Sequence, residues 1–167
     1  MRVRAFSMAD FEAVASLWRS SGFETRPGDS RSELRRKLRR DPDLFLVAQE
    51  DSRIVGSVLG AWDGRRGWVY HLAVDPGHRR RHIAQKMLSE LESRMKEKGV
   101  LKVNAMVYLW NDPSLSLFEG QGYNRQSDMV VMGKQLLGGG RGAHAGSGRA
   151  RRRGDPNPSP SDDPTSS

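Results

Sequence analysis

The chain has 167 residues, a net charge of +8 and a hydrophobic fraction of 36%. It contains no cysteine, which excludes disulfides, zinc sites built from thiolates and a cysteine nucleophile. It has no apolar run long enough to cross a membrane, and its N-terminus lacks the apolar core of a signal peptide. We therefore expect a cytoplasmic protein with no membrane contact and one folded domain.

Residues 138–167 differ in composition from the rest of the chain. They contain no large apolar side chain, five arginines and three aspartates, among many glycine, serine and proline residues. Such a segment cannot offset its ordering entropy by burial, so we expect a disordered tail after a folded domain of residues 1–137. The folded part then carries +6 of the charge. We attribute this charge to an anionic ligand and solvated arginine faces, and we do not expect nucleic-acid binding.

Hydrophobic periodicity predicts three elements in the first 41 residues. A short strand at residues 3–6 comes first. Ser7 and Asp10 then form a capping-box pattern in front of an amphipathic helix. Residues 30–41 predict a second helix, which is strongly basic and whose arginines form a solvated face.

The remaining segments predict mostly strands, in the overall order β-α-α-β-β-β-α-β-α-β. They are two strands of a hairpin around Asp51 and Ser52, a strand at 67–74, a helix at 83–98, a strand at 101–109, a helix at 112–118 and a strand at 129–136. Five apolar residues form one stripe of the helix at 83–98, and Gly99 ends it. This mixed order indicates an α/β sheet covered on both faces.

The stretch "VDPGHRRRHIAQKML" (residues 74–88) connects the strand at 67–74 to the long helix. A strand, a turn with free backbone donors and a helix N-terminus together form an anion site. Arg79, Arg80 and Arg81 add positive charge to it. The stretch is not a P-loop, and no G-x-G-x-x-G follows a strand, so nucleotide hydrolysis and dinucleotide binding lack their usual motifs.

The run Arg79-Arg80-Arg81-His82-Ile83-Ala84 resembles the acyl-CoA loop [RQ]-x-x-G-x-[GA] of the GNAT superfamily of N-acetyltransferases. The stretches "LFLVAQ", "VGSVLGAWDGRRG", "HLAVDPGHRRRHIAQKMLSELE" and "NDPSLSLFEGQGY" also resemble the family, in family order. "AWDGRRG" and the chain length resemble its small bacterial YpeA-like branch, related to RimI. The resemblance implies a single mixed α/β sheet of about six to seven strands flanked by four helices, with a splay between the fourth and fifth strands.

The resemblance also implies acetyl-CoA as co-substrate, no metal, and transfer to a primary amine. The acceptor would be a small molecule or a protein amine, and the protein a monomer or homodimer. The pyrophosphate would lie on the loop backbone, and the pantetheine arm would pair with the edge of the fourth strand. The implied cofactor-binding residues are Leu72, Ala73, Val74, Arg79, Arg80, Arg81, His82, Ile83, Ala84, Asn111 and Phe118.

Two residues depart from the family pattern. His82 replaces the loop glycine, which brings a Cβ and a ring toward the ligand. A positive φ there would cost about 1–2 kcal/mol, whereas an ordinary helix-start φ would leave the backbone donors intact. We expect weakened but retained binding. Phe118 replaces a tyrosine that commonly protonates the leaving thiolate, and general acid–base catalysis is worth roughly 10²–10⁴-fold.

The candidate catalytic residues are His71 and Tyr108. His71, on the fourth strand, is the best-placed base. Tyr108 is the nearest phenol if Asn104, Met106 and Tyr108 share a strand face that lines the slot. Reaction would proceed by direct attack of the amine, with a backbone N–H near Leu72 or Ala73 stabilising the oxyanion.

Three alternatives to this interpretation stay open. Both candidate side chains could simply pack in the core. The chain could instead be a non-catalytic acyl-CoA sensor, for which Phe118 fits equally well. It could also be an interaction module with a decayed site, for which His82 fits.

Overall fold

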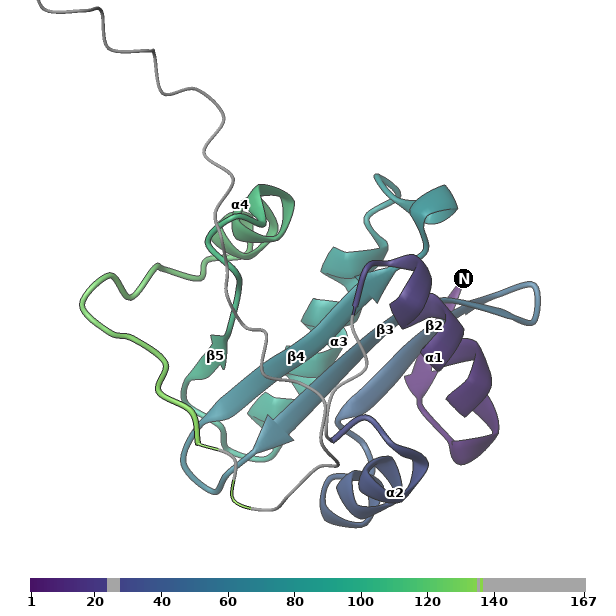
Figure 1. Ribbon diagram of the computed structural model, residues 1–167, viewed down its shortest axis with the longest axis horizontal. Helices are drawn as coiled ribbons and strands as arrows, with labels where there is room; N and C mark the ends of the chain where they lie inside the picture. Colours follow the sequence, from purple (N-terminus) through teal and green to yellow (C-terminus); the bar gives the residue numbers. More distant parts are fainter. Residues whose placement is uncertain (24–27, 135, 137–167) are drawn as a thin grey trace, which may run out of the picture. The chain divides into compact units, whose positions relative to one another are not determined.

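The computed structural model describes residues 1–23, 28–134 and 136. Five strands form one mixed sheet in the order β1-β2-β3-β4-β5 (Figure 1). They are β1 (Arg2–Ala5), β2 (Phe45–Glu50), β3 (Arg53–Trp62), β4 (Gly67–Val74) and β5 (Val103–Ala105). Neighbouring strands are antiparallel except β4 and β5, which are parallel. The predicted α/β class is therefore confirmed.

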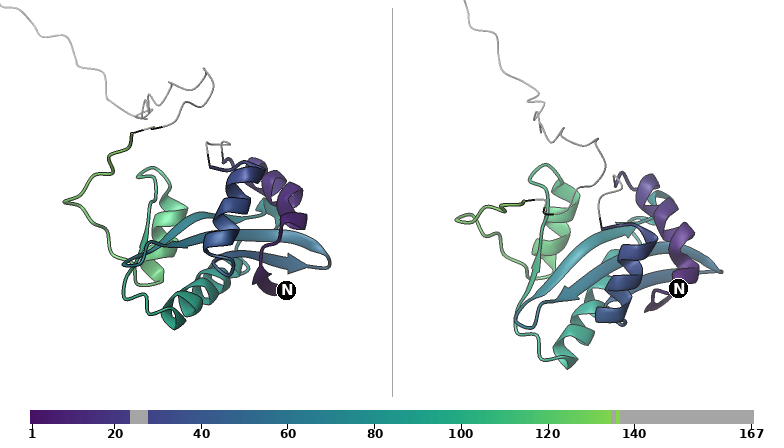
Figure 2. Two further views of the ribbon diagram at one scale, coloured as in Figure 1. Left: turned by 90° about the horizontal axis from the view of Figure 1, so that it is seen from below. Right: turned by 60° about the horizontal axis from the view of Figure 1, so that its bottom comes forward.

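Helices cover both faces of the sheet. They are α1 (Phe11–Ser20), α2 (Arg31–Arg40), α3 (Ile83–Glu97) and α4 (Asp112–Gly120), with short 3₁₀ turns η1 (Met8–Asp10) and η2 (Pro76–His78). Figure 2 shows α1 and α2 on one face of the sheet, here called the α1/α2 face, and α3 on the other. Each face has its own buried apolar cluster. No helix in the described part of the chain is long and apolar enough to span a membrane.

Capping residues and a buried apolar stripe account for the predicted helices and their ends. The α3 stripe is buried against the sheet, as the spacing predicts: Ile83, Met87, Leu88, Leu91 and Met95. Gly99 follows α3 with φ 80°, a left-handed conformation that suits glycine. The Ser30 hydroxyl accepts a hydrogen bond from the Glu33 N–H and caps α2, and the Ser7 N–H donates to the Asp10 carboxylate.

The β2–β3 hairpin is confirmed as well. Asp51 and Ser52 have φ of 44° and 67°, which is the pairing that a two-residue type I′ turn needs. Further along β3, α3 lies close to the sheet. A Cβ on Gly60 would lie 2.6 Å from Leu91 Cδ1 and 3.0 Å from the Leu44 carbonyl oxygen. Glycine therefore sets the distance between α3 and the sheet.

The C-terminal part of the fold corrects three predictions. The sheet has five strands among the described residues, not six to seven. The strand predicted at 101–109 is wrong in extent, because only Val103–Ala105 pair with β4, and Met106 and Tyr108 lie beyond its end. Within the strand predicted at 129–136, residues 129–134 have no regular structure. Their apolar side chains are exposed, so no buried face stabilises a strand there.

A compact unit comprises Met1–Val131, and the second unit begins at Met132. The tail predicted at residues 138–167 lies outside the described residues.

Candidate active site

The sheet opens between β4 and β5. These strands pair only where Gly67, Trp68 and Val69 face Val103, Asn104 and Ala105. β4 then continues to Val74, so the rest of its β5-facing edge has no strand partner in the described part of the chain (Figure 1). This is the predicted splay, and it exposes strand donors and acceptors that an extended ligand can use.

A β-bulge lies in β4 beside this opening. The pairing with β3 shifts between Ser57, opposite Ala73, and Leu59, opposite Tyr70. The bulge residue His71 has a left-handed φ of 47°. A bulge re-aims side chains, and here both Tyr70 and His71 line one cavity on the α1/α2 face.

The bulge also determines which backbone donors face the open edge. The Asp75 N–H donates to the Val55 carbonyl of β3 at 2.9 Å. Because hydrogen-bonding groups alternate sides along a strand, Ala73 faces β3, and the N–H groups of Leu72 and Val74 face the opening. Ala73 is buried on the α1/α2 face, whereas Leu72 and Val74 pack toward α3.

The His71 imidazole is held by aromatic rings and a carboxylate. Its ring centroid lies 4.6 Å from that of Trp18 and 5.4 Å from that of Phe23. Its Nε2 lies 3.1 Å from Asp29 Oδ1, and its side chain is 21% exposed. With Nε2 donating to Asp29, Nδ1 carries the lone pair and can accept a proton. The sequence contains no signal that Asp29 is the partner of His71.

The connection from β4 to α3 presents unpaired backbone donors. None of the N–H groups from Arg79 to Gln85 donates to an acceptor among residues that the structure describes. Arg80 and His82 both adopt left-handed conformations, with φ of 59° and 58°. Such a curved row of N–H groups at a helix N-terminus is suited to bind an anion.

His82 therefore occupies the strained one of the two conformations considered from the sequence. Its φ of 58° and ψ of 20° place it directly before α3, in the region that favours glycine. Histidine adopts this region more readily than most side chains. The His82 side chain is exposed.

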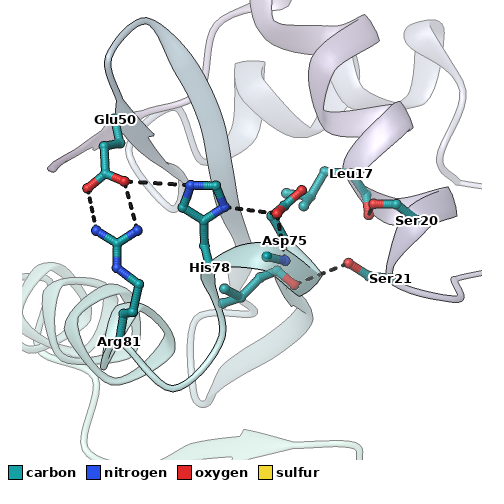
Figure 3. Close-up of polar contacts among 9 residues, drawn as sticks. Leu17, Ser20, Ser21, Glu50, Asp75, His78 and Arg81 are labelled. Carbon is teal, nitrogen blue, oxygen red and sulfur yellow. Dashed lines mark hydrogen bonds and ion pairs between the residues drawn. The ribbon is translucent and has the colours of Figure 1, made fainter.

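The three loop arginines have different surroundings. Arg81 forms two hydrogen bonds with Glu50, of 3.0 and 2.9 Å (Figure 3), and this guanidinium lowers the pKa of the Glu50 carboxyl. His78 lies between Asp75, at 2.8 Å from its Nδ1, and Glu50, at 3.6 Å from its Nε2. Arg81 thus ties the loop to the β2–β3 hairpin. Arg79 and Arg80 are exposed and form no ion pair with described residues, so they are the charges free to meet an anion.

The remaining predicted site residues lie after β5. Phe118 is 7% exposed and meets the Tyr123 ring edge-on at 5.0 Å. The Tyr123 hydroxyl donates to Glu92, and burial raises its pKa. The Asn111 side chain accepts from the Ser114 N–H at 3.3 Å and caps α4. Tyr108 is 49% exposed, and its ring stacks on Trp110 at 5.0 Å.

The profile of the Acetyltransferase (GNAT) family matches residues 11–123. The chain belongs to this family. An acetyltransferase of Sodalis glossinidius is 39% identical over 137 residues, which are 82% of this chain and 96% of that protein. An acetyltransferase of Pectobacterium atrosepticum is 40% identical over the same shares.

The fold of this GNAT family member also matches solved structures. The PaiA N-acetyltransferase of Thermoplasma acidophilum, solved in complex with coenzyme A, superposes with a TM-score of 0.66 at 23% identity. The match covers 72% of this chain and 87% of that one. The resemblance drawn from four stretches of sequence is therefore confirmed at the level of the family and fold.

Proposed function

We propose that this GNAT protein transfers an acetyl group from acetyl-CoA to a primary amine by direct attack. The observation that carries the proposal is the combination of an open β4 edge with the row of unpaired N–H groups at the start of α3. The first suits an extended pantetheine arm and the second suits a pyrophosphate. The coenzyme A bound to the similarly folded PaiA enzyme supports the same assignment.

The cofactor contacts follow from these two features. The N–H groups from Arg79 to Ala84 would bind the pyrophosphate, with Arg79 and Arg80 contributing charge. The Leu72 carbonyl and the Val74 N–H, which face the opening, would pair with the pantetheine arm. Asn111, at the N-terminus of α4, would contact the same arm, and Phe118 would pack beside it as an apolar wall.

When bound, acetyl-CoA supplies an activated acetyl group. The Leu72 N–H, which faces the opening, stabilises the developing oxyanion, and the register favours it over the Ala73 N–H. His71, oriented by Asp29, accepts the proton that the amine nitrogen releases as the C–N bond forms and the C–S bond breaks. Positioning of the two substrates supplies most of the rate.

This site lacks the usual proton donor for the leaving thiolate. Phe118 has no proton to donate, and its ring is buried against Tyr123. We assign protonation of the thiolate to Tyr108 or to water, and we expect slower turnover than in relatives with a phenol at this position.

A non-catalytic acyl-CoA sensor is the second candidate, and the observation that favours it is the buried Phe118 ring. It predicts acetyl-CoA binding without release of free coenzyme A in the presence of any amine. A decayed interaction module predicts no binding.

Thermal unfolding with and without excess acetyl-CoA tests binding. A ligand at 100 times its Kd adds about 2.7 kcal/mol, or very roughly 2–4 °C in Tm at this size. Release of the coenzyme A thiol with a panel of amines tests transfer, and the absence of cysteine from the chain removes any protein background from a thiol reagent.

The variants His71→Gln and Tyr108→Phe test the assigned roles. We expect His71→Gln to lower kcat at neutral pH while the acetyl-CoA shift in Tm persists. A kcat that is unchanged in both variants would refute the catalytic roles of His71 and Tyr108. A wild-type Tm that does not rise with acetyl-CoA would refute acetyl-CoA binding.

A further inference from the structure

A cavity of about 400 Å³ lies beside the bulge, between α2 and the α1/α2 face of β3 and β4. Its lining includes Tyr70 and His71, which directly precede the β4 edge residues assigned above to the pantetheine arm. Leu34 and Leu59 give it an apolar floor. Its volume lies in the range of small-molecule sites. A molecule in this cavity therefore lies next to the proposed acetyl position.

Charges of both signs line this cavity. Asp29, which orients His71, lies on one side. Arg36 and Arg40, one helical turn apart, project from α2. Their side chains are 69% and 65% exposed. Such a lining complements a ligand that carries a positive and a negative group.

The two arginines are the cations available to such a ligand. Lys37 also lines the cavity, but its ammonium group is bonded to the buried Asp41 carboxylate. Arg36 lies 3.4 Å from the carboxylate of Glu33, which also lines the cavity. Arg40 donates to the Trp62 carbonyl at 3.1 Å and lies 4.0 Å from the Asp41 carboxylate. Each guanidinium has five N–H donors, so both keep donors for a ligand carboxylate. A guanidinium binds a carboxylate through two parallel hydrogen bonds, which an ammonium group cannot do.

We infer that the acceptor is a small amine that also bears a carboxylate, such as a free amino acid. Its amino group lies toward Asp29 and His71, and its carboxylate lies on Arg36 and Arg40. This inference rests on the proposed acetyl transfer, because it assigns the acceptor of that reaction. Polyamines are disfavoured, since the two arginines repel a second cation.

The test compares acceptors with and without the carboxylate, at matched concentrations of the neutral amine, because loss of the carboxylate also changes the basicity of the amine. L-Phenylalanine is compared with L-phenylalaninamide, and L-lysine with cadaverine, by release of the coenzyme A thiol. We expect kcat/KM to be about two- to tenfold higher for the acids, because both guanidinium groups are exposed and solvent screens their attraction for a carboxylate. The Arg36→Gln/Arg40→Gln variant should bring this ratio near one by raising KM for the acids.

Arg35→Gln/Arg39→Gln is the matched control. It removes the same charge from exposed positions of the same helix that do not line the cavity. We expect it to keep the preference for the acids. Equal rates for acids and amides, or an equal loss in both double variants, would overturn the inference. A preference for a peptide with a blocked C-terminus would overturn it as well.

Thermal unfolding of the protein loaded with coenzyme A separates this inference from the proposed transfer. If no amine is acetylated, a rise in Tm with L-phenylalanine but not its amide, lost in Arg36→Gln/Arg40→Gln, would support the carboxylate site while refuting transfer. If the amides alone are acetylated, the transfer stands and the carboxylate site is refuted. No turnover together with no carboxylate-dependent rise in Tm would refute both.

Discussion

Replacing His82 by glycine should stabilise the folded protein relative to replacing it by alanine. His82 has φ 58° and ψ 20°, where an L-residue costs about 1–2 kcal/mol relative to glycine. Alanine keeps the Cβ that causes this cost, whereas glycine removes it. Glycine also increases the entropy of the unfolded chain, which offsets about 0.4–1 kcal/mol. The expected difference in unfolding free energy is therefore about 1 kcal/mol in favour of His82→Gly.

Urea denaturation of both variants measures this difference, because the two lack the imidazole and differ only at the Cβ. The control pair is Ser89→Gly and Ser89→Ala, at an exposed position inside α3. There the order should reverse, since glycine costs about 1 kcal/mol relative to alanine in a helix interior. A His82→Gly protein no more stable than His82→Ala would refute the argument that the loop is strained at this residue.

Three further predictions concern the catalytic step, the core and acid stability. Phe118→Tyr should raise kcat for acetyl transfer without changing KM for acetyl-CoA, because it adds a proton donor beside the proposed thiolate; an unchanged kcat would assign that proton to another group. Gly60→Ala should lower the unfolding free energy by about 1–3 kcal/mol in denaturant titration, because its Cβ would collide with Leu91 and approach the Leu44 carbonyl. Asp63 accepts from the Arg65 and Arg66 N–H groups and from Trp68, which lowers its pKa to about 2. Because the pKa of Asp63 is lower in the folded than in the unfolded protein, its ionised carboxylate stabilises the fold above the usual carboxyl pKa, and this stabilisation is lost as the pH falls toward 2. The difference in unfolding free energy between wild type and Asp63→Asn should therefore narrow between the usual carboxyl pKa and pH 2. Above the usual carboxyl pKa this difference should stay constant.

The sequence predicted those elements whose side chains have one buried face and clear end signals. The α3 stripe repeats at helical spacing and ends at a glycine, and every stripe residue is buried. The hairpin turn has two polar residues between apolar strands, and both adopt left-handed conformations. The loop from β4 to α3 could be located in the same way, because a strand, a turn and a helix start each leave a pattern.

The predictions failed where structure depends on a partner rather than on local pattern. Residues 101–109 alternate like a strand, but only three of them find a neighbour in β4. Residues 129–134 have strand-forming side chains that remain exposed. The partnership of His71 with Asp29 and Trp18 joins three distant segments, and no spacing rule predicts it.

The strained residues of this protein are not spread evenly. Among the described residues, five other than glycine have a left-handed φ. Asp51 and Ser52 are accounted for by their turn, which requires that conformation. The other three, His71, Arg80 and His82, all lie between the open edge of β4 and the start of α3. Glycine at any of them would relieve the cost of a left-handed side chain.

Local structure accounts for a side chain at each of these three positions, where glycine would be less strained. His71 is held by two aromatic rings and Asp29, and its bulge brings Tyr70 and His71 to the same cavity. Arg80 and His82 curve the backbone so that consecutive N–H groups have no acceptor among the described residues. Backbone strain of this kind persists where surrounding structure over-determines it, and it clusters at ligand sites. The strain, the open strand edge and the unpaired donors all lie near the β4 bulge, and together they support the proposal that the reaction occurs there.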